Sequence, residues 1–298
     1  MQLAATFLSL LAFGAVPQQA LAVSPVPSLI ETLAQTELER AVVAFEAGEW
    51  QQVLEIVQAA PEGTDDGPRL AYLAGETQLI LGRREQAATS FRFVLEQRPD
   101  AVPAKVGLAR ALTGTGGLEE AEQLLTGVLA AEPKDVGAKT AMGLLLAQLD
   151  RLEDARAELA GASKLAPRNA LTARAYVEVL LRSELLPEAA GVAEAFAVER
   201  PEHPMGHFLL AVVMERDGQD ELAITSYQAA LAKDPNFLDA HKNLAILCHT
   251  LSNTYQDKAR TKLAFAHYER YFALGGSDAQ LRATYDNLLG FKEQILGS

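Results

Sequence analysis

Apolar and polar positions along this chain recur with a fixed spacing of 34 residues. Proline is the simplest marker of the spacing, and it returns without drift at Pro99, Pro133, Pro167, Pro201 and Pro235. If each repeat is counted so that its proline is position 32, position 20 is always alanine: Ala87, Ala121, Ala155, Ala189 and Ala223. A spacing without insertions indicates that every repeat packs on its neighbour in one geometry.

Within each repeat the pattern predicts two antiparallel helices. Small residues dominate positions 8 and 20, where they let the helices approach closely, and larger side chains at positions 24 and 27 fill the space toward the next repeat. Position 8 reads Gly75, Ala109, Gly143, Val177 and Ala211, and position 24 reads Phe91, Leu125, Leu159, Ala193 and Tyr227. The proline lies past the second helix, which it cannot continue. Glycine at position 15 (Gly82, Gly116 and Gly218) suits a tight turn between the two helices.

This pattern resembles the tetratricopeptide repeat family. The segment GHFLLAVVMERDGQDELAITSYQAALAKDPN, from Gly206 to Asn236, is the best match, although His207 and Met214 replace the tryptophan and tyrosine that the family has at positions 4 and 11. The resemblance covers five repeats, residues 68–235, and two more loosely. It implies an all-α fold, a right-handed superhelical solenoid of antiparallel helix pairs. It also implies a concave groove, lined mainly by first helices, that binds extended or helical peptides and is seldom catalytic.

The segments that flank the regular repeats predict a capped array. Residues 23–67 contain a degenerate helix pair that turns at Gly48, followed by a linker, and residues 68–276 form the repeat array. In the last repeat the position-20 alanine, Ala264, follows Ala245 by 19 residues rather than 12, so about one extra turn is expected in each helix. Residues 277–298 are expected to form a C-terminal cap helix that starts with a capping box of Ser277 and Gln280.

The N-terminus is typical of an exported protein. Residues 1–22 have an apolar run from Leu3 to Val16 and then Ala20-Leu21-Ala22, so they are interpreted as a signal peptide cleaved after Ala22, although no basic residue precedes Arg40. The apolar run is shorter than the roughly 20 residues that a membrane span needs, so no stable span is expected after cleavage. A periplasmic location follows, and the alternative is a cytoplasmic protein whose first segment is an ordinary helix.

Composition argues against several classes of function. The net charge of −13 and the lack of a basic stripe disfavour nucleic acid as a partner. The single cysteine, Cys248, excludes an intramolecular disulfide and a cysteine-based zinc site, and no HExxH motif is present. The GTGG stretch at 114–117 falls in a helix-to-helix turn, with no preceding strand that a phosphate loop would need. We therefore expect no catalytic residue, no metal and no cofactor.

The resemblance implies which residues face a partner. In the family, positions 2, 5, 9 and 12 of first helices point into the groove, and this gives, with two matches to the family's carboxylate clamp, the candidates Tyr72, Glu76, Arg110, Arg174, Glu178, Phe208, Val212, Lys242, Asn243 and Ile246. The two arginines lie beside the two glutamates and pair either with them or with a ligand. Phe208, Val212 and Ile246 form an apolar strip suited to an amphipathic helix or a hydrophobic peptide. Only Lys242 and Asn243 match the clamp, so recognition of a peptide's terminal carboxylate is not expected.

Residues 255–271 are the one locally basic and aromatic segment of this acidic chain, with Tyr255, Lys258, Arg260, Lys262, Tyr268, Arg270 and Tyr271. They either cover a long helix and pack on the cap or form a second docking surface. The function expected first is therefore an exported adapter that holds a partner's peptide within a bacterial envelope complex. The alternatives are a permanent structural subunit of an envelope machine that uses its convex face or lengthened repeat, and a cytoplasmic scaffold. The sequence gives no indication of the oligomeric state.

Overall fold

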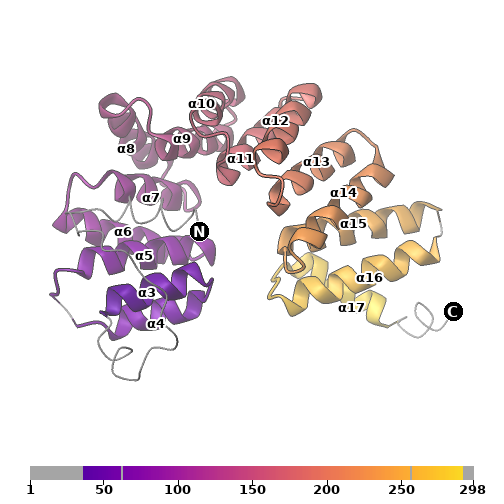
Figure 1. The fold of residues 1–298 in the computed structure, drawn as a ribbon, viewed down its shortest axis with the longest axis horizontal. Helices are drawn as coiled ribbons and strands as arrows, with labels where there is room; N and C mark the ends of the chain where they lie inside the picture. Colours follow the sequence, from indigo (N-terminus) through magenta and orange to yellow (C-terminus); the bar gives the residue numbers. More distant parts are fainter. Residues whose placement is uncertain (1–35, 62, 256, 291–298) are drawn as a thin grey trace, which may run out of the picture. The chain divides into compact units, whose positions relative to one another are not determined.

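All regular secondary structure in the described part of the chain is α-helical (Figure 1). The computed structural model describes residues 36–61, 63–255 and 257–290, and in these ranges fifteen helices, α3 to α17, follow one another without a strand. The predicted all-α solenoid of helix pairs is confirmed. The chain divides into two compact units, residues 1–149 and 150–298. The predicted signal peptide (1–22) and the end of the predicted cap helix beyond residue 290 lie outside the described residues.

The first unit contains seven helices within the described residues. They are α3 (Glu37–Glu46), α4 (Trp50–Ala59), α5 (Gly67–Ile80), α6 (Arg84–Gln97), α7 (Val102–Thr113), α8 (Leu118–Ala131) and α9 (Val136–Gln148). The second unit contains the other eight. They are α10 (Leu152–Leu165), α11 (Ala170–Arg182), α12 (Leu186–Glu199), α13 (Pro204–Arg216), α14 (Asp220–Lys233), α15 (Leu238–Tyr255), α16 (Lys258–Ala273) and α17 (Ala279–Leu289).

The small positions of the repeat are where helices meet. All five position-20 alanines, listed above by sequence, are completely buried. Phe91, at position 24 of α6, is also fully buried, and its ring lies against two glycines. A Cβ atom built on Gly75 would lie 2.8 Å from that ring and one on Gly107 would lie 2.5 Å from it, so neither position tolerates a side chain without movement of Phe91. The bulky ring of Phe91 thus fits because its neighbours are glycines.

The turn between the two helices of a repeat needs a left-handed residue at position 15. Gly82, Gly116 and Gly218 have φ of 72°, 89° and 75°, as glycine permits. The two other repeats place Asp150 (φ 58°) and Glu184 (φ 59°) at the same position. A side chain there costs roughly 1–2 kcal/mol, because Cβ crowds the following carbonyl oxygen. The period therefore imposes the left-handed conformation even where the sequence does not supply glycine.

The N-terminal helix pair follows the same plan but ends early. The α3–α4 turn contains Gly48 at φ 75°, as expected from the sequence. Helix α4 begins at Trp50, which lies 34 residues before the start of α6, yet it has 10 residues where α6 has 14. The period places a proline at residue 65, but the proline here is Pro61, and Ala60 before it is extended (φ −65°, ψ 139°). Pro61 thus ends α4 one turn early.

The last repeat lengthens unevenly, which differs from the expectation of one extra turn in each helix. Helix α15 has 18 residues against 13 in α13, whereas α16 has 16 against 14 in α14. The start of α16 is fixed by Asp257, whose Oδ1 accepts hydrogen bonds from the backbone N–H groups of Ala259 (2.8 Å) and Arg260 (3.2 Å). Because this cap sets where α16 begins, most of the insertion extends α15.

The cap helix α17 begins one residue later than predicted. The expected capping box of Ser277 and Gln280 is wrong, since the N-cap is Asp278, whose Oδ1 accepts from the N–H groups of Gln280 (3.1 Å) and Leu281 (3.0 Å). A carboxylate at this place also interacts favourably with the positive end of the helix dipole. Asp278 additionally pairs with Lys242 of α15 at 3.2 Å, which fixes the start of α17 against the last repeat.

Candidate partner-binding surfaces

A small cleft on α13 and α15 contains three of the predicted groove residues. Val212 and Ile246, at position 9 of consecutive repeats, are both partly exposed, and they line the cleft with Asn243. Glu215 and Arg216 complete the lining, and the cleft has a volume of about 340 Å³. It therefore offers two aliphatic side chains, an amide, a guanidinium and a carboxylate to one ligand. We call it the Val212–Ile246 cleft.

Phe208 does not share this exposure. Its side chain is 4 % exposed and packs on the rings of Phe237 and Tyr227, with centroids 5.0 and 5.8 Å away. The predicted apolar strip is thus open only at Val212 and Ile246, because aromatic side chains on and after α14 cover Phe208. Phe208 supports the surface from beneath.

A hydrogen-bonded chain of three residues borders the cleft. The hydroxyl of Tyr227 donates to Oε2 of Glu215 at 2.6 Å and accepts from Nδ2 of Asn243 at 3.2 Å. Burial raises the pKa of the Glu215 carboxyl and that of the Tyr227 hydroxyl. Sequence reasoning omitted Glu215, although it occupies position 12, which the family pattern gives as an inward position. The hydrogen bond to Tyr227 holds the Asn243 amide in one orientation at the edge of the cleft.

Most charged candidates in the second unit are paired within the chain. Arg174 Nη1 lies 2.6 Å from Oδ2 of Asp239, rather than pairing with Glu178, and Lys242 pairs with Asp278. In the part of the chain that the structure describes, Glu178 and Arg216 are exposed and form no ion pair. At these first-helix positions, Glu178 and Arg216 are therefore charges that a ligand can engage without breaking an existing ion pair.

The candidates of the first unit form a cluster of their own. Arg110 Nη1 donates to both carboxylate oxygens of Glu76 at 3.0 Å, so the pairing of these two residues, one of the two sequence alternatives, is what the structure has. Tyr72 packs edge-on to Phe91 with ring centroids 5.7 Å apart, and burial together with the Glu76 charge raises the pKa of its hydroxyl. Arg110 and Glu76 thus satisfy one another's charge, and with Tyr72 they form a polar surface on α5 and α7.

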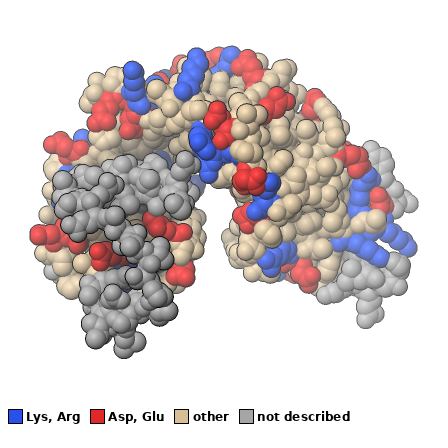
Figure 2. Space-filling model, in the orientation of Figure 1, with Lys and Arg blue, Asp and Glu red and all other residues tan. Residues whose placement is uncertain are grey.

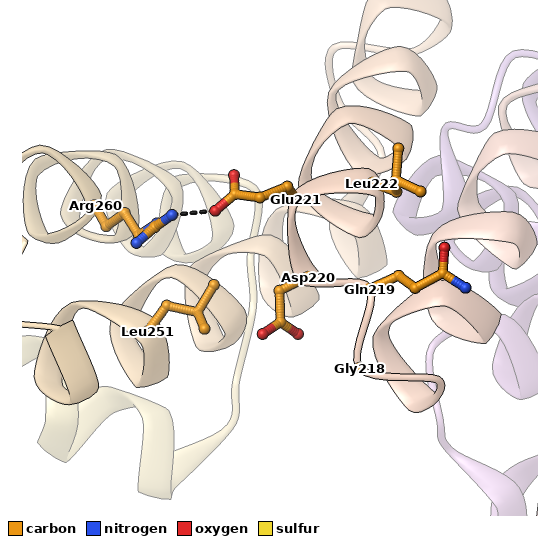
Figure 3. Close-up of a pocket in the computed structure, with 7 residues that line it drawn as sticks. All are labelled: Gly218, Gln219, Asp220, Glu221, Leu222, Leu251 and Arg260. Carbon is orange, nitrogen blue, oxygen red and sulfur yellow. Dashed lines mark hydrogen bonds and ion pairs between the residues drawn. The ribbon is translucent and has the colours of Figure 1, made fainter.

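A second cavity lies beside the lengthened repeat (Figure 3). It has a volume of about 480 Å³ and lies between the α13–α14 turn, the start of α14, the extended end of α15 and Arg260 of α16. Glu221 and Arg260 face one another and form an ion pair, whereas Asp220 turns its carboxylate away from that pair. Leu222 at the rim is 51 % exposed. We call this cavity the Leu222 notch.

The basic and aromatic segment around the notch is mostly structural. Tyr268 and Tyr271 are buried, Arg260 also pairs with Asp257 at 3.3 Å, and Arg270 donates to Oδ1 of Asn236 at 2.5 Å. Lys258 remains exposed. These contacts favour the interpretation that the segment covers a long helix and packs on the cap.

The described residues show little else that resembles a chemical site. They contain no group of three or more histidine, cysteine, aspartate or glutamate side chains placed to hold a metal ion. Cys248 is buried, and burial raises the pKa of its thiol to about 11, so it remains a protonated packing residue at neutral pH. None of the helices described is long and apolar enough to span a membrane. On the face shown in Figure 2, basic and acidic side chains are interspersed over the surface.

Comparison with known proteins agrees with the repeat pattern. Family models described as tetratricopeptide repeat match residues 78–145 and residues 177–236. No curated protein matches the chain significantly. Among solved structures, a thermophilic TPR protein of Thermus thermophilus is 22 % identical, with a TM-score of 0.56, and the match covers 60 % of this chain and 98 % of that one.

Two further solved structures match over a larger share of this chain. A tetratricopeptide repeat protein from Parabacteroides merdae is 15 % identical with a TM-score of 0.60, and the match covers 84 % of this chain and 96 % of the other. PilF of Pseudomonas aeruginosa is 18 % identical with a TM-score of 0.51, and the match covers 76 % and 100 %. At these identities the three likenesses show the fold alone.

Proposed function

The chain belongs to the tetratricopeptide repeat family, whose repeats imply a protein–protein interaction scaffold, and from this premise we propose that it is an exported, non-catalytic adapter. In this proposal it holds a peptide segment of a partner protein in its concave groove, within a bacterial envelope complex. The signal-like pattern of residues 1–22 motivates the export, and cleavage after Ala22 leaves a mature chain that begins at Val23.

The observation that carries the proposal is the Val212–Ile246 cleft. Two aliphatic side chains on neighbouring first helices are partly exposed side by side in one lining. Asn243 and Arg216 supply donors, and Glu215 supplies an acceptor, at the edge of the same cleft. This arrangement suits a peptide with one apolar face, because the aliphatic pair buries its side chain while the polar rim pairs with its backbone or termini.

Crosslinking in the cell tests the groove directly. A photoreactive side chain at position 212 or 246 of the full chain, followed by mass spectrometry, should capture one envelope protein, and Val212→Glu with Ile246→Glu should abolish its recovery. Val198→Glu is the matched control, because Val198 lies on second helix α12 and is already 79 % exposed. Circular dichroism must show unchanged helix content in all variants. Undiminished recovery with the double variant would reject the groove.

One observation favours the alternative of a permanent structural subunit. The exposed Leu222 and the carboxylate of Asp220, which points away from the neighbouring ion pair, lie beside the lengthened repeat and not at first-helix positions (Figure 3). If crosslinks arise from positions 222 and 258 and not from 212 or 246, the chain is a built-in subunit that contacts its machine through this repeat. N-terminal sequencing separates the third alternative: a mature chain beginning at Val23 supports export, whereas a full-length cytosolic chain supports a cytoplasmic scaffold.

A further inference from the structure

The early end of α4 opens a cleft in the first unit. Helix α4 starts in register with α6 but ends at Ala59, one turn short of the length of α6. The missing four residues correspond to about 6 Å of helix. The space beside it is lined by α4, the residues that follow α4, α5 and α6, and has a volume of about 1190 Å³. We call it the α4–α6 cleft.

An aromatic side chain faces this cleft at a position that is otherwise small. Phe93 is position 26 of its repeat, and the equivalent residues in the following repeats are Gly127, Gly161, Ala195 and Ala229. Phe93 is 45 % exposed and lines the cleft together with Leu54 of α4. The exposed part of the Phe93 ring does not contribute the stabilisation that its burial would give. The sequence thus places its one position-26 aromatic where the neighbouring helix leaves room for a ligand.

Neutral amides dominate the polar part of the lining. Helix α4 contributes Gln51 and Gln58, α5 contributes Gln78, and α6 contributes Gln86 and Gln97. Each glutamine amide both donates and accepts hydrogen bonds, as a peptide backbone does. Two acidic and two basic side chains also line the cleft, namely Glu55, Asp65, Arg83 and Arg98, so its formal charge is zero in a chain whose net charge is −13. The cleft therefore matches an uncharged polar ligand with an apolar anchor.

We propose that the α4–α6 cleft binds an extended, uncharged peptide segment of a partner protein. One apolar side chain of the segment packs on Phe93 and Leu54, and its backbone amides pair with the glutamines. Helix α6, with 14 residues, is about 21 Å long. At about 3.3 Å per residue, roughly six extended residues span it. The site is formed by α4, α5 and α6 of the first unit, whereas the Val212–Ile246 cleft is formed by α13 and α15 of the second unit, so the two share no residue.

The test is selection from a phage-displayed library of random peptides on the immobilised full chain, with affinities of the selected peptides measured by fluorescence anisotropy. We expect Phe93→Ala to weaken the selected uncharged peptides by at least about tenfold, as loss of an aromatic anchor does. Gln97→Ala should weaken them less. Phe93 is half exposed, so its removal should leave the thermal unfolding midpoint nearly unchanged. Val198→Ala is the control for loss of an exposed apolar side chain and should have no effect.

Three outcomes would overturn the proposal. In the first, the selected peptides bind Phe93→Ala as tightly as the original chain. In the second, they bind only while Val212 and Ile246 are intact, which supports the groove alone. In the third, sedimentation shows a concentration-dependent dimer that Phe93→Ala abolishes, which makes a second copy of the chain the occupant. Conversely, peptides lost with Phe93→Ala but retained with Val212→Glu and Ile246→Glu support this site whatever becomes of the adapter proposal.

Discussion

The Nδ1 atoms of His241 and His267 lie 2.8 Å apart, and this contact determines where both rings hold their protons. Nε2 of His241 lies 3.1 Å from the carbonyl oxygen of Pro235, which only accepts, so this nitrogen carries a proton. In the neutral ring Nδ1 of His241 is then the acceptor, and Nδ1–H of His267 donates to it. With these tautomers the pair is satisfied while His241 is neutral, and a second proton, on its Nδ1, would require His267 to move its own proton to Nε2.

Acid should therefore weaken the last repeat. Burial lowers the pKa of His241; the nearby Arg270 lowers it further, whereas Asp234 raises it. Burial and the nearby His241 lower the pKa of His267 to about 4. Since the unfolded rings titrate near 6.5, the unfolded state binds more protons as pH falls from 6.5 toward 4, and stability is lost across that window. We expect a loss of about 1–2 kcal/mol after allowance for solvent screening of the partly exposed His267 ring.

Denaturant unfolding followed by circular dichroism between about pH 7 and pH 4 measures this loss. His267→Gln removes one titrating ring and should reduce the pH dependence. His207→Gln, at the same repeat position as His241 but in the preceding repeat, is the control for replacing a histidine outside the pair. Burial also lowers the pKa of His203 and His249, so part of the dependence should persist in every variant. Equal slopes for the original chain and His267→Gln would contradict the role of the pair.

The left-handed turn residues predict a stabilising change. Glu184 has φ 59° with an exposed side chain, so Glu184→Gly relieves the crowded Cβ at little other cost. Glycine's greater freedom in the unfolded chain offsets part of the gain, which leaves roughly 0.5–1 kcal/mol. The melting midpoint of the second unit should rise.

Asp150→Gly should gain less, because it also removes the 3.0 Å ion pair with Arg182, although Asp150 is largely exposed and such a pair contributes little. Gly218→Ala is the reverse control. A Cβ at Gly218 meets nothing within 4 Å, so any loss of stability reports the backbone conformation alone. A neutral result for both Glu184→Gly and Gly218→Ala would show that φ at position 15 carries no strain.

Because the Phe91 ring packs against Gly107, replacing this glycine even by alanine is predicted to destabilise the fold. Gly107→Ala would place Cβ 2.5 Å from the buried ring, which must then shift, and we expect a loss of about 1–2 kcal/mol. Gly127→Ala is the matched control: it also lies within a helix, but a Cβ there meets nothing within 4 Å, so the better helix former should stabilise by about 0.5–1 kcal/mol.

A double-mutant cycle with Phe91→Leu isolates the contact in thermal unfolding measurements. The smaller side chain should recover part of the Gly107→Ala loss, because the two residues touch and their effects are then not additive. If the effects of Gly107→Ala and Phe91→Leu on stability are strictly additive, the contact between these two residues is not the source of the loss.

The cap on α16 predicts a difference between two substitutions at one position. Asp257→Ala removes the acceptor of two backbone N–H groups and should cost about 1 kcal/mol, whereas Asp257→Asn keeps an acceptor and should cost a few tenths. Chemical unfolding of both variants measures the difference. If alanine and asparagine destabilise equally, the ion pair with Arg260 rather than the cap stabilises this helix start.

The 34-residue spacing predicted the helix pairs because its markers act locally. Proline ends a helix through its own ring, glycine permits a left-handed turn, and alanine at position 20 is buried wherever helices cross. The spacing could not predict that Phe208 would be buried, since Phe237 and Tyr227, which cover it, come from outside α13. The spacing also could not predict how the seven inserted residues divide between α15 and α16. That division depends on Asp257, whose side chain caps the first turn of α16 and so sets where this helix begins.

Size complementarity was visible in the sequence only in part. Position 8 was expected to be small, and Val177 is the exception. The residue at position 24 of that same repeat is Ala193, the smallest of its set, and both residues belong to one buried cluster. Phe91 against two glycines is the opposite arrangement. In these two repeats a larger residue at one position is matched by a small residue at the other, which a reading of single positions does not show.

Pro61 also determines which part of the folded chain opens first. Helices α3 and α4 have ten residues each, too short to persist in water without packing. Among the described residues, the buried part of their core is small and is shared with α5: Ala41, Ala44, Val53, Ile56, Leu70 and Leu73. Such a unit opens before the rest of the array, so its amide hydrogens exchange first. Each opening briefly exposes Leu70 and Leu73 and turns α5 into a temporary end of the array. One early proline thereby lets the α3–α4 pair open and close while the repeats after it stay folded.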